Sequence, residues 1–125
     1  MQEEKKPDFS KPVDIQAYFY NSFHACGCSE LDEMIKEVKR VLSWATQNIM
    51  ERVCFSKLYE NSGCFYLIAG LLDSVGFLEH GTSIRGTWAT EAGKSFLGAL
   101  NKFTEEEICN SEGEAYDGCI YYKSL

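Results

Sequence analysis

The chain has 125 residues, 45% of them hydrophobic and 14% aromatic, so it can bury the core of one domain and disorder is expected only near its ends. Its net charge of −7 disfavours nucleic acid as a partner, because the twelve Lys and Arg residues are scattered and a phosphate backbone needs clustered cations. No apolar run approaches the ~20 residues of a membrane span, and the N-terminal segment has no apolar signal core. We therefore expect a cytoplasmic protein without a membrane partner, whose six cysteines are reduced.

The N-terminal third predicts a tail and two helices. Residues 1–12 are polar and contain both prolines, which indicates a flexible tail ahead of a single domain spanning 13–125. Asp14 is positioned to N-cap a short helix, and Ser29 to cap a longer amphipathic helix over residues 29–46. The apolar face of the short helix is formed by Ile15, Tyr18, Phe19 and Phe23, and that of the longer one by Leu31, Met34, Ile35, Val38, Val41, Leu42 and Ala45.

The middle of the chain predicts two further helices. One would cover about residues 49–59, although whether the preceding helix bends or breaks near Asn48 is open. The other covers 64–77, where Asp73 is the only charge, so we expect it to be buried on most faces. Gly76 is expected to end it as a C-cap glycine.

The C-terminal part predicts a hairpin and more helix. Strands are expected at 77–80 and 83–89, around a turn at Gly81-Thr82. Thr90 then caps a helix whose shared apolar face is Phe96, Leu97, Leu100 and Phe103.

Three shorter features complete this region. Gly93, in the first turn of that helix, permits a close backbone approach. Thr104 and Glu107 form a capping box, residues 109–119 a loop, and 120–122 a closing strand. The fold class expected is α+β and helix-rich, with four or five helices and a small antiparallel hairpin.

Two stretches, "LIAGLLDSVGFLEHG" and "TWATEAGKSFL", resemble the second half of a winged-helix domain. The resemblance covers about residues 66–100 and implies a winged-helix-like domain over about 29–103. It makes 64–77 the third helix, the hairpin the wing, and 29–46 and 49–59 the two preceding helices. The Gly-Cys-rich turn with an "EHG" hairpin also resembles uncharacterised prophage-type small proteins, which imply no particular activity.

The sequence departs from a DNA-reading winged helix in its charges. Such a domain needs donors on its third helix and cations on its wing. Here the third helix offers Tyr66 and Asp73, and no Lys or Arg stands between Lys57 and Arg85.

A protein partner is therefore the first expectation: a non-enzymatic interaction module, of the phage-type regulator or inhibitor kind. Its candidate contact residues are His80, Arg85 and Trp88 on the wing and Lys36, Lys39 and Arg40 on the long helix. The alternative is a transcription regulator that binds DNA as a homodimer through a basic surface assembled on dimerisation.

The stretch "HACGC" allows three interpretations. His24, Cys26 and Cys28 could bind zinc if His80 or another cysteine supplied a fourth ligand. Cys28, just before a helix N-terminus, could instead be a reactive thiol with His24 as its base. The third interpretation is a structural turn at Gly27. Because no fourth ligand follows at a regular spacing, we expect the turn, no cofactor and no catalytic residue, with zinc as the alternative.

Overall fold

The computed structural model describes residues 9–25 and 28–111 of the chain. Helices dominate this part, and two short strands form an antiparallel sheet. The expected helix-rich α+β class with a small hairpin is therefore confirmed. In chain order the elements are α1 (Pro12–Ser22), α2 (Cys28–Thr46), the 3-10 turn η1 (Phe55–Lys57), α3 (Ser62–Ser74), β1 (Leu78–Glu79), the 3-10 turn η2 (Ile84–Gly86), β2 (Trp88–Ala89), α4 (Glu91–Asn101) and α5 (Glu105–Cys109).

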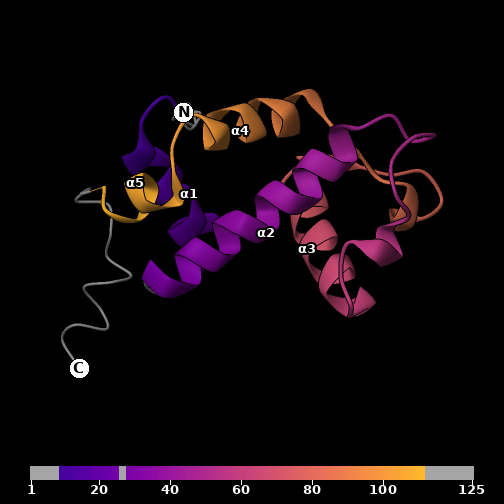
Figure 1. The fold of residues 1–125 in the computed structure, drawn as a ribbon. Helices are drawn as coiled ribbons and strands as arrows, with labels where there is room; N and C mark the ends of the chain where they lie inside the picture. The colour runs from indigo at the N-terminus through magenta and orange to yellow at the C-terminus, as the bar shows by residue number, and fades with distance from the viewer. Residues whose placement is uncertain (1–8, 26–27, 112–125) are drawn as a thin grey trace, which may run out of the picture.

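Helix α2 is the central element of the fold. It runs across the middle of the molecule, with α1 and α5 near the end where it begins, α4 along the top and α3 beside its second half (Figure 1). It packs against α3, α4, α5 and β2. Within the described ranges, no helix has both the length and the apolarity that crossing a membrane requires.

The amphipathic pattern of α2 is confirmed. Its start differs slightly from the expectation, because α2 begins at Cys28 and Ser29 therefore lies inside the helix rather than before it. The polar face points to solvent, whereas one continuous face is buried: Leu31, Ile35, Val38, Val41, Leu42, Trp44 and Ala45.

Helix α1 begins three residues earlier than expected. Pro12 occupies its first turn and Lys11 is the N-cap residue, so Asp14 lies within the first turn and is not the cap. Proline favours this position because its fixed φ suits a helix and its missing N–H would be unpaired there anyway. Phe9, within the segment expected to be a tail, packs edge-on against Phe96, with the ring centroids 4.8 Å apart.

The expectation of a helix over 49–59 is wrong. Residues 47–61 form an irregular connection with a single 3-10 turn, η1. The side-chain oxygen of Asn48 accepts a hydrogen bond from the N–H of Met50 at 2.9 Å, a local turn that competes with helix. The indole of Trp44 also donates to the carbonyl of Val53 at 2.8 Å, which holds the connection against the end of α2.

Helix α3 is more exposed than its composition suggests. Phe65, Ala69 and Leu72 are buried, but Leu67 is 77% exposed. The expectation of burial on most faces is therefore wrong: α3 packs against α2, β1, η1 and η2, yet its side chains at 62–64, 66 and 67 are exposed. Its end is as expected: Gly76 has a φ of +83°, and the N–H of Phe77 reaches back to the carbonyl of Leu72 at 2.9 Å, a Schellman-type cap.

The hairpin is shorter than expected. Leu78 pairs with Ala89 and Glu79 with Trp88, so each strand has two residues, and η2 occupies much of the longer second strand that the sequence predicted. The Thr87 hydroxyl donates to the carbonyl of Glu79 at 2.8 Å, which closes the loop above the paired residues.

Helices α4 and α5 have the predicted caps. Thr90 accepts from the N–H of Gly93 at 3.0 Å and donates to the carbonyl of Gly76 at 2.6 Å, tying the start of α4 to the end of α3. Thr104 and Glu107 form the predicted capping box of α5. The predicted strand at 120–122 and the loop from 112 onward lie outside the described residues.

Two groups of packed aromatic rings contribute to the core, and Tyr66, which is 40% exposed, lies at the edge of the second. One joins the N-terminal segment, α1, the start of the hairpin and α4, and contains Phe9, Tyr18, Phe19, Phe23, Phe77 and Phe96. The other joins the end of α2, the connection and α3, and contains Trp44, Phe55, Phe65 and Tyr66. Helix α2 lies along both groups, so it links the two ends of the domain.

Candidate protein-interaction surface

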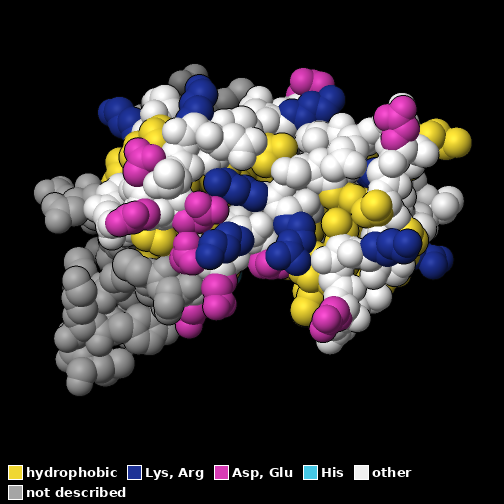
Figure 2. Space-filling view, in the orientation of Figure 1, with side chains coloured by type: hydrophobic (Ala, Val, Ile, Leu, Met, Phe, Trp, Pro, Cys, Tyr) yellow, Lys and Arg dark blue, Asp and Glu magenta, His cyan; other side chains and the backbone are white. Residues whose placement is uncertain are grey.

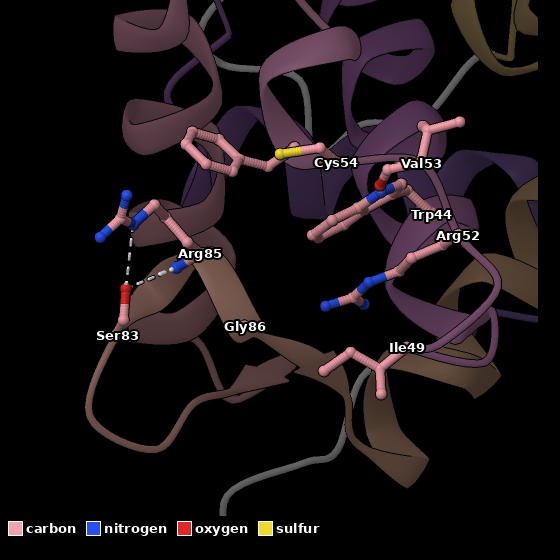
Figure 3. A pocket seen from close by; sticks show the side chains of 9 residues that line it. Trp44, Ile49, Arg52, Val53, Cys54, Ser83, Arg85 and Gly86 are labelled. Carbon is pink, nitrogen blue, oxygen red and sulfur yellow. Dashed lines mark hydrogen bonds between the residues drawn. The ribbon is translucent and has the colours of Figure 1, made fainter.

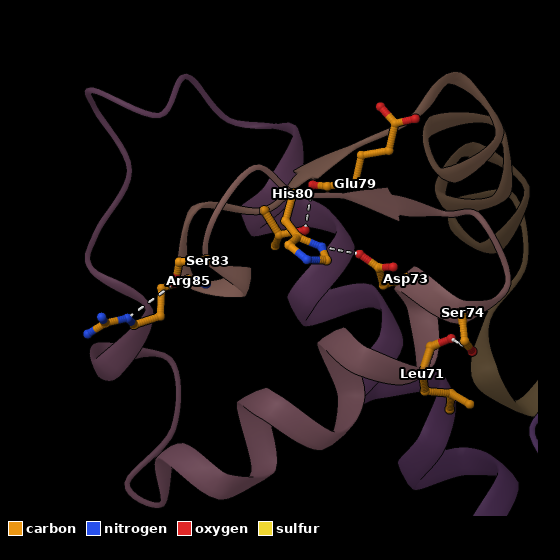
Figure 4. Close-up of polar contacts among 8 residues, drawn as sticks. Leu71, Asp73, Ser74, Glu79, His80, Ser83 and Arg85 are labelled. Carbon is orange, nitrogen blue, oxygen red and sulfur yellow. Dashed lines mark hydrogen bonds and ion pairs between the residues drawn. The ribbon is translucent and has the colours of Figure 1, made fainter.

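The three predicted contact residues of the wing do not line one common site: His80 and Trp88 border one hollow, and Arg85 lines another pocket. The Nδ1 atom of His80 lies 2.6 Å from a carboxylate oxygen of Asp73, so the wing is tied to α3 (Figure 4). Trp88, on β2, is 44% exposed. His80 and Trp88 border a shallow hollow of about 400 Å³, whose remaining lining is Asp73, Gly76, Leu78, Glu79 and Thr90. Two carboxylates line this hollow, and the one on Asp73 is already paired with His80.

The predicted cationic face of α2 is neutralised by its own neighbours. Lys36 pairs with Asp32 at 3.0 Å, and Lys39 with Glu105 of α5 at 3.5 Å. Arg40 pairs with Glu37 at 3.4 Å, and its guanidinium also lies 5.0 Å from the ring centroid of Tyr59. These three cations are therefore weaker contact candidates than the sequence suggested, since a new partner would have to compete with existing ones.

A pocket between the connection and the wing escaped sequence reasoning. It has a volume of about 420 Å³ and brings the end of α2 and residues 49–55 together with residues 83–86 (Figure 3). Of the predicted site residues only Arg85 contributes to it. The lining is Trp44, Ile49, Arg52, Val53, Cys54, Phe55, Ser83, Arg85 and Gly86.

Arg52 dominates the chemistry of this pocket. Its guanidinium lies 3.6 Å from the ring centroid of Trp44, and Figure 3 shows it extending from the connection into the open space. Burial lowers the pKa of Arg52 from its ordinary value, yet a guanidinium stays protonated at neutral pH. Its Nη1 atom is buried and has no hydrogen-bond partner among the described residues.

Two further groups shape the charge around the pocket. The Arg85 side chain lies at the rim, where its Nε contacts the Ser83 hydroxyl at 3.4 Å. The pKa of the Cys54 thiol is lowered, first by a hydrogen bond from Ser56 and further by the charges of Lys57 and Arg85.

Exposed apolar side chains lie on the connection, where Ile49 and Val53 line the pocket, and on α3, which packs against η1. We call them the apolar rim; its exposed fractions run from 40% for Tyr66 to 87% for Met50. Figure 2 shows hydrophobic and basic side chains side by side over α3 and the connection, whereas acidic side chains gather over the first half of α2. The rim consists of Ile49, Met50, Val53, Tyr66 and Leu67.

The predicted zinc site lies largely outside the described part of the chain. This holds for Cys26 and for the side chain of Cys28, so zinc and the reactive-thiol alternative both stay predictions. His24 is exposed and has a φ of +57°. In residues 9–25 and 28–111 no three His, Cys, Asp or Glu side chains are grouped as a metal site. Cys54, Cys64 and Cys109 form no disulfide within the described ranges.

Comparisons with known proteins give no information about the function. No protein-family model, curated protein or solved structure matches the chain.

Proposed function

We propose that the protein is a non-enzymatic protein-interaction module that regulates or inhibits another protein by binding it. The observation that carries the proposal is the apolar rim, which leaves five large apolar side chains exposed on two neighbouring segments. Removing such side chains from water is the main driving force of protein association, and contiguous exposed apolar patches mark interaction sites.

The identity of the outward residues on α3 favours a protein over DNA. In the winged-helix resemblance, α3 takes the place of the helix that reads base edges. Its outward side chains include Tyr66 and Leu67, and base recognition needs donors and acceptors that Leu67 lacks. An aromatic and an aliphatic side chain instead suit the centre of a protein interface.

The test is site-specific photocrosslinking in the native host. A benzophenone amino acid replaces Leu67, and the control carries it at Ser95, which is exposed on α4 away from the rim. We expect a discrete crosslinked protein from position 67 only, lost when Met50 is changed to Asp. A crosslink to a second copy of the chain would identify a homodimer, and equal crosslinking from both positions would refute the proposal.

A second candidate is a DNA-binding regulator that acts as a dimer. It is favoured by Arg52, Lys57 and Arg85, which form no ion pair with a described carboxylate and lie close to the connection and the wing. A labelled duplex tests it at ~150 mM salt, which weakens purely electrostatic binding. Tight binding that Lys57→Glu and Arg85→Glu abolish would reverse the order of the two candidates.

A further inference from the structure

The pocket beside the apolar rim is positively charged and has no acidic lining residue. Arg52 and Arg85 contribute the charge, and the other seven lining residues are uncharged or, in the case of Cys54, a thiol. Neither arginine pairs with a carboxylate in the part of the chain that the structure describes. This contrasts with α2, where Lys36, Lys39 and Arg40 each have an acidic neighbour.

Arg52 is held in place but incompletely bonded. Stacking on Trp44, whose own N–H is fixed on the carbonyl of Val53, defines the plane of the guanidinium. Its Nη1 nevertheless lacks an acceptor among residues 9–25 and 28–111. No described acceptor bonds this guanidinium, so the N–H groups that reach the open pocket are available to an acceptor that enters it. A planar guanidinium fixed in this way suits a carboxylate, which can accept two parallel hydrogen bonds.

We propose that this pocket binds the carboxylate of an Asp or Glu side chain that is flanked by apolar residues on the partner protein. The guanidinium of Arg52 binds the carboxylate, and Arg85 provides a second positive charge at the wing side of the pocket. The apolar rim contacts the apolar residues that flank the carboxylate. The inference rests on the proposed function and specifies the chemistry of the partner.

Charge balance favours such a segment over DNA. The pocket offers two cations, which are enough to neutralise one carboxylate, whereas a duplex presents a phosphate charge every ~1.7 Å along its axis. The net charge of −7 repels such a polyanion far more strongly than it repels one acidic side chain. The pocket walls are also largely aromatic and aliphatic: Trp44, Ile49, Val53 and Phe55.

The test uses the full chain, labelled with ¹⁵N, and two mixtures of short peptides. Each peptide is acetylated and amidated and has the form Ser-X-Asp-X-X-Ser, with Leu, Phe or Val at each X; the second mixture has Asn in place of Asp. The indole N–H signal of Trp44 reports on the pocket, and Trp88→Phe assigns it because the chain has two tryptophans. We expect the Asp mixture to shift this signal at a concentration about tenfold lower than the Asn mixture.

Variants assign the preference to the arginines. Arg52→Gln should reduce the tenfold preference to less than about twofold, and Arg52→Lys should retain part of it because the charge remains but the planar fork is lost. Arg85→Gln should have a smaller effect. The matched control is Lys94→Gln, which removes one positive charge from α4 and should leave the preference unchanged. Urea unfolding of every variant separates loss of binding from loss of fold.

Several outcomes would overturn the inference. They are equal shifts with both mixtures, no shift with either, or an Asp preference that survives Arg52→Gln in a folded protein. A duplex that shifts the Trp44 signal where the peptides do not would assign the pocket to nucleic acid. Crosslinking from position 67 does not depend on Arg52, so success there with failure here would refute only the carboxylate inference, and failure there would refute the proposed function.

Discussion

At the scale of single residues, Gly93 is the tightest point in the fold. A Cβ atom built on Gly93 would lie 2.1 Å from the carbonyl oxygen of Phe77, which is backbone and cannot rotate away. We expect Gly93→Ala to lower the free energy of unfolding by about 2 kcal/mol or more, because α4 must move off the hairpin to accommodate the methyl group. Urea unfolding followed by circular dichroism measures the change.

The same helix provides the control. Gly98 has nothing within 4 Å of its would-be Cβ. Gly98→Ala should therefore stabilise the protein by up to about 1 kcal/mol, since alanine is the better helix former. If both substitutions stabilised the protein, α4 would not approach Phe77 as the structure places it.

A second residue-scale prediction concerns Tyr59. Burial, and after it the Glu37 carboxylate, raises the pKa of the Tyr59 hydroxyl above its ordinary value. The folded protein thus disfavours the phenolate, while the unfolded chain ionises near pH 10. Stability is retained below about pH 10 and should fall as pH rises above it, because the unfolded state then loses protons that the folded state keeps.

Substitution identifies the group responsible for that fall. Urea unfolding between about pH 9 and pH 11 should show a shallower decline in Tyr59→Phe than in the wild type. Glu37→Gln should also make the decline shallower, because it removes one cause of the raised pKa. Parallel declines in all three proteins would show that Tyr59 does not titrate differently in the folded and unfolded states.

Two of the four helix N-caps predicted from the sequence are present, and two, at Asp14 and Ser29, are not. The caps at Thr90 and Thr104 were predictable because each hydroxyl bonds a backbone N–H three residues ahead. The role of Arg52 was not predictable, because it depends on how the connection folds back onto Trp44. No periodic pattern encodes the path of an irregular segment.

At the scale of elements, the same reason explains the two errors in the middle of the chain. Residues 49–59 contain enough apolar side chains for a helix, yet the Asn48 turn and the Trp44–Val53 hydrogen bond hold them in another conformation. Helix α3 looks buried by composition, but burial depends on neighbours, and the helix expected at 49–59 did not form. Both errors concern segments that contribute residues to the apolar rim, so the sequence pattern did not reveal this surface.

The short helix α5 provides an element-scale prediction. It has five residues, buries Ile108, and accepts a hydrogen bond from Gln16 of α1 on the carbonyl of Cys109 at 3.1 Å. A helix this short depends on its cap, so Thr104→Ala should cost about 1 kcal/mol of unfolding free energy. Thr104→Ser keeps the hydroxyl and should lose much less. Equal losses in the two variants, measured by urea unfolding, would mean that the methyl group rather than the cap matters.

At the scale of the whole molecule, charge and apolar surface are separated. Acidic side chains gather over the first half of α2 (Figure 2). Arg52 and Arg85, which pair with no described carboxylate, instead lie with Ile49 and Val53 around the pocket at the end of α2. The net charge of −7 does not reveal this separation, because it is the sum of the charges over the whole chain. A net value therefore argues against a polyanion but does not exclude a local site for one carboxylate.

The position of α2 along both aromatic groups predicts that the two ends of the domain unfold together. Leu42 is fully buried on α2, and Leu42→Ala should cost about 2–5 kcal/mol through lost burial and the cavity left behind. Because α2 links the ends, hydrogen exchange should lose protection equally at Phe19 in α1 and Ala69 in α3. Ser43→Ala, at an exposed neighbour, should change stability by less than about 0.5 kcal/mol. If protection fell at Ala69 while Phe19 kept its wild-type value, the connection, α3 and the wing would form a separate unfolding unit, and α2 would not couple the interaction surface to the rest of the fold.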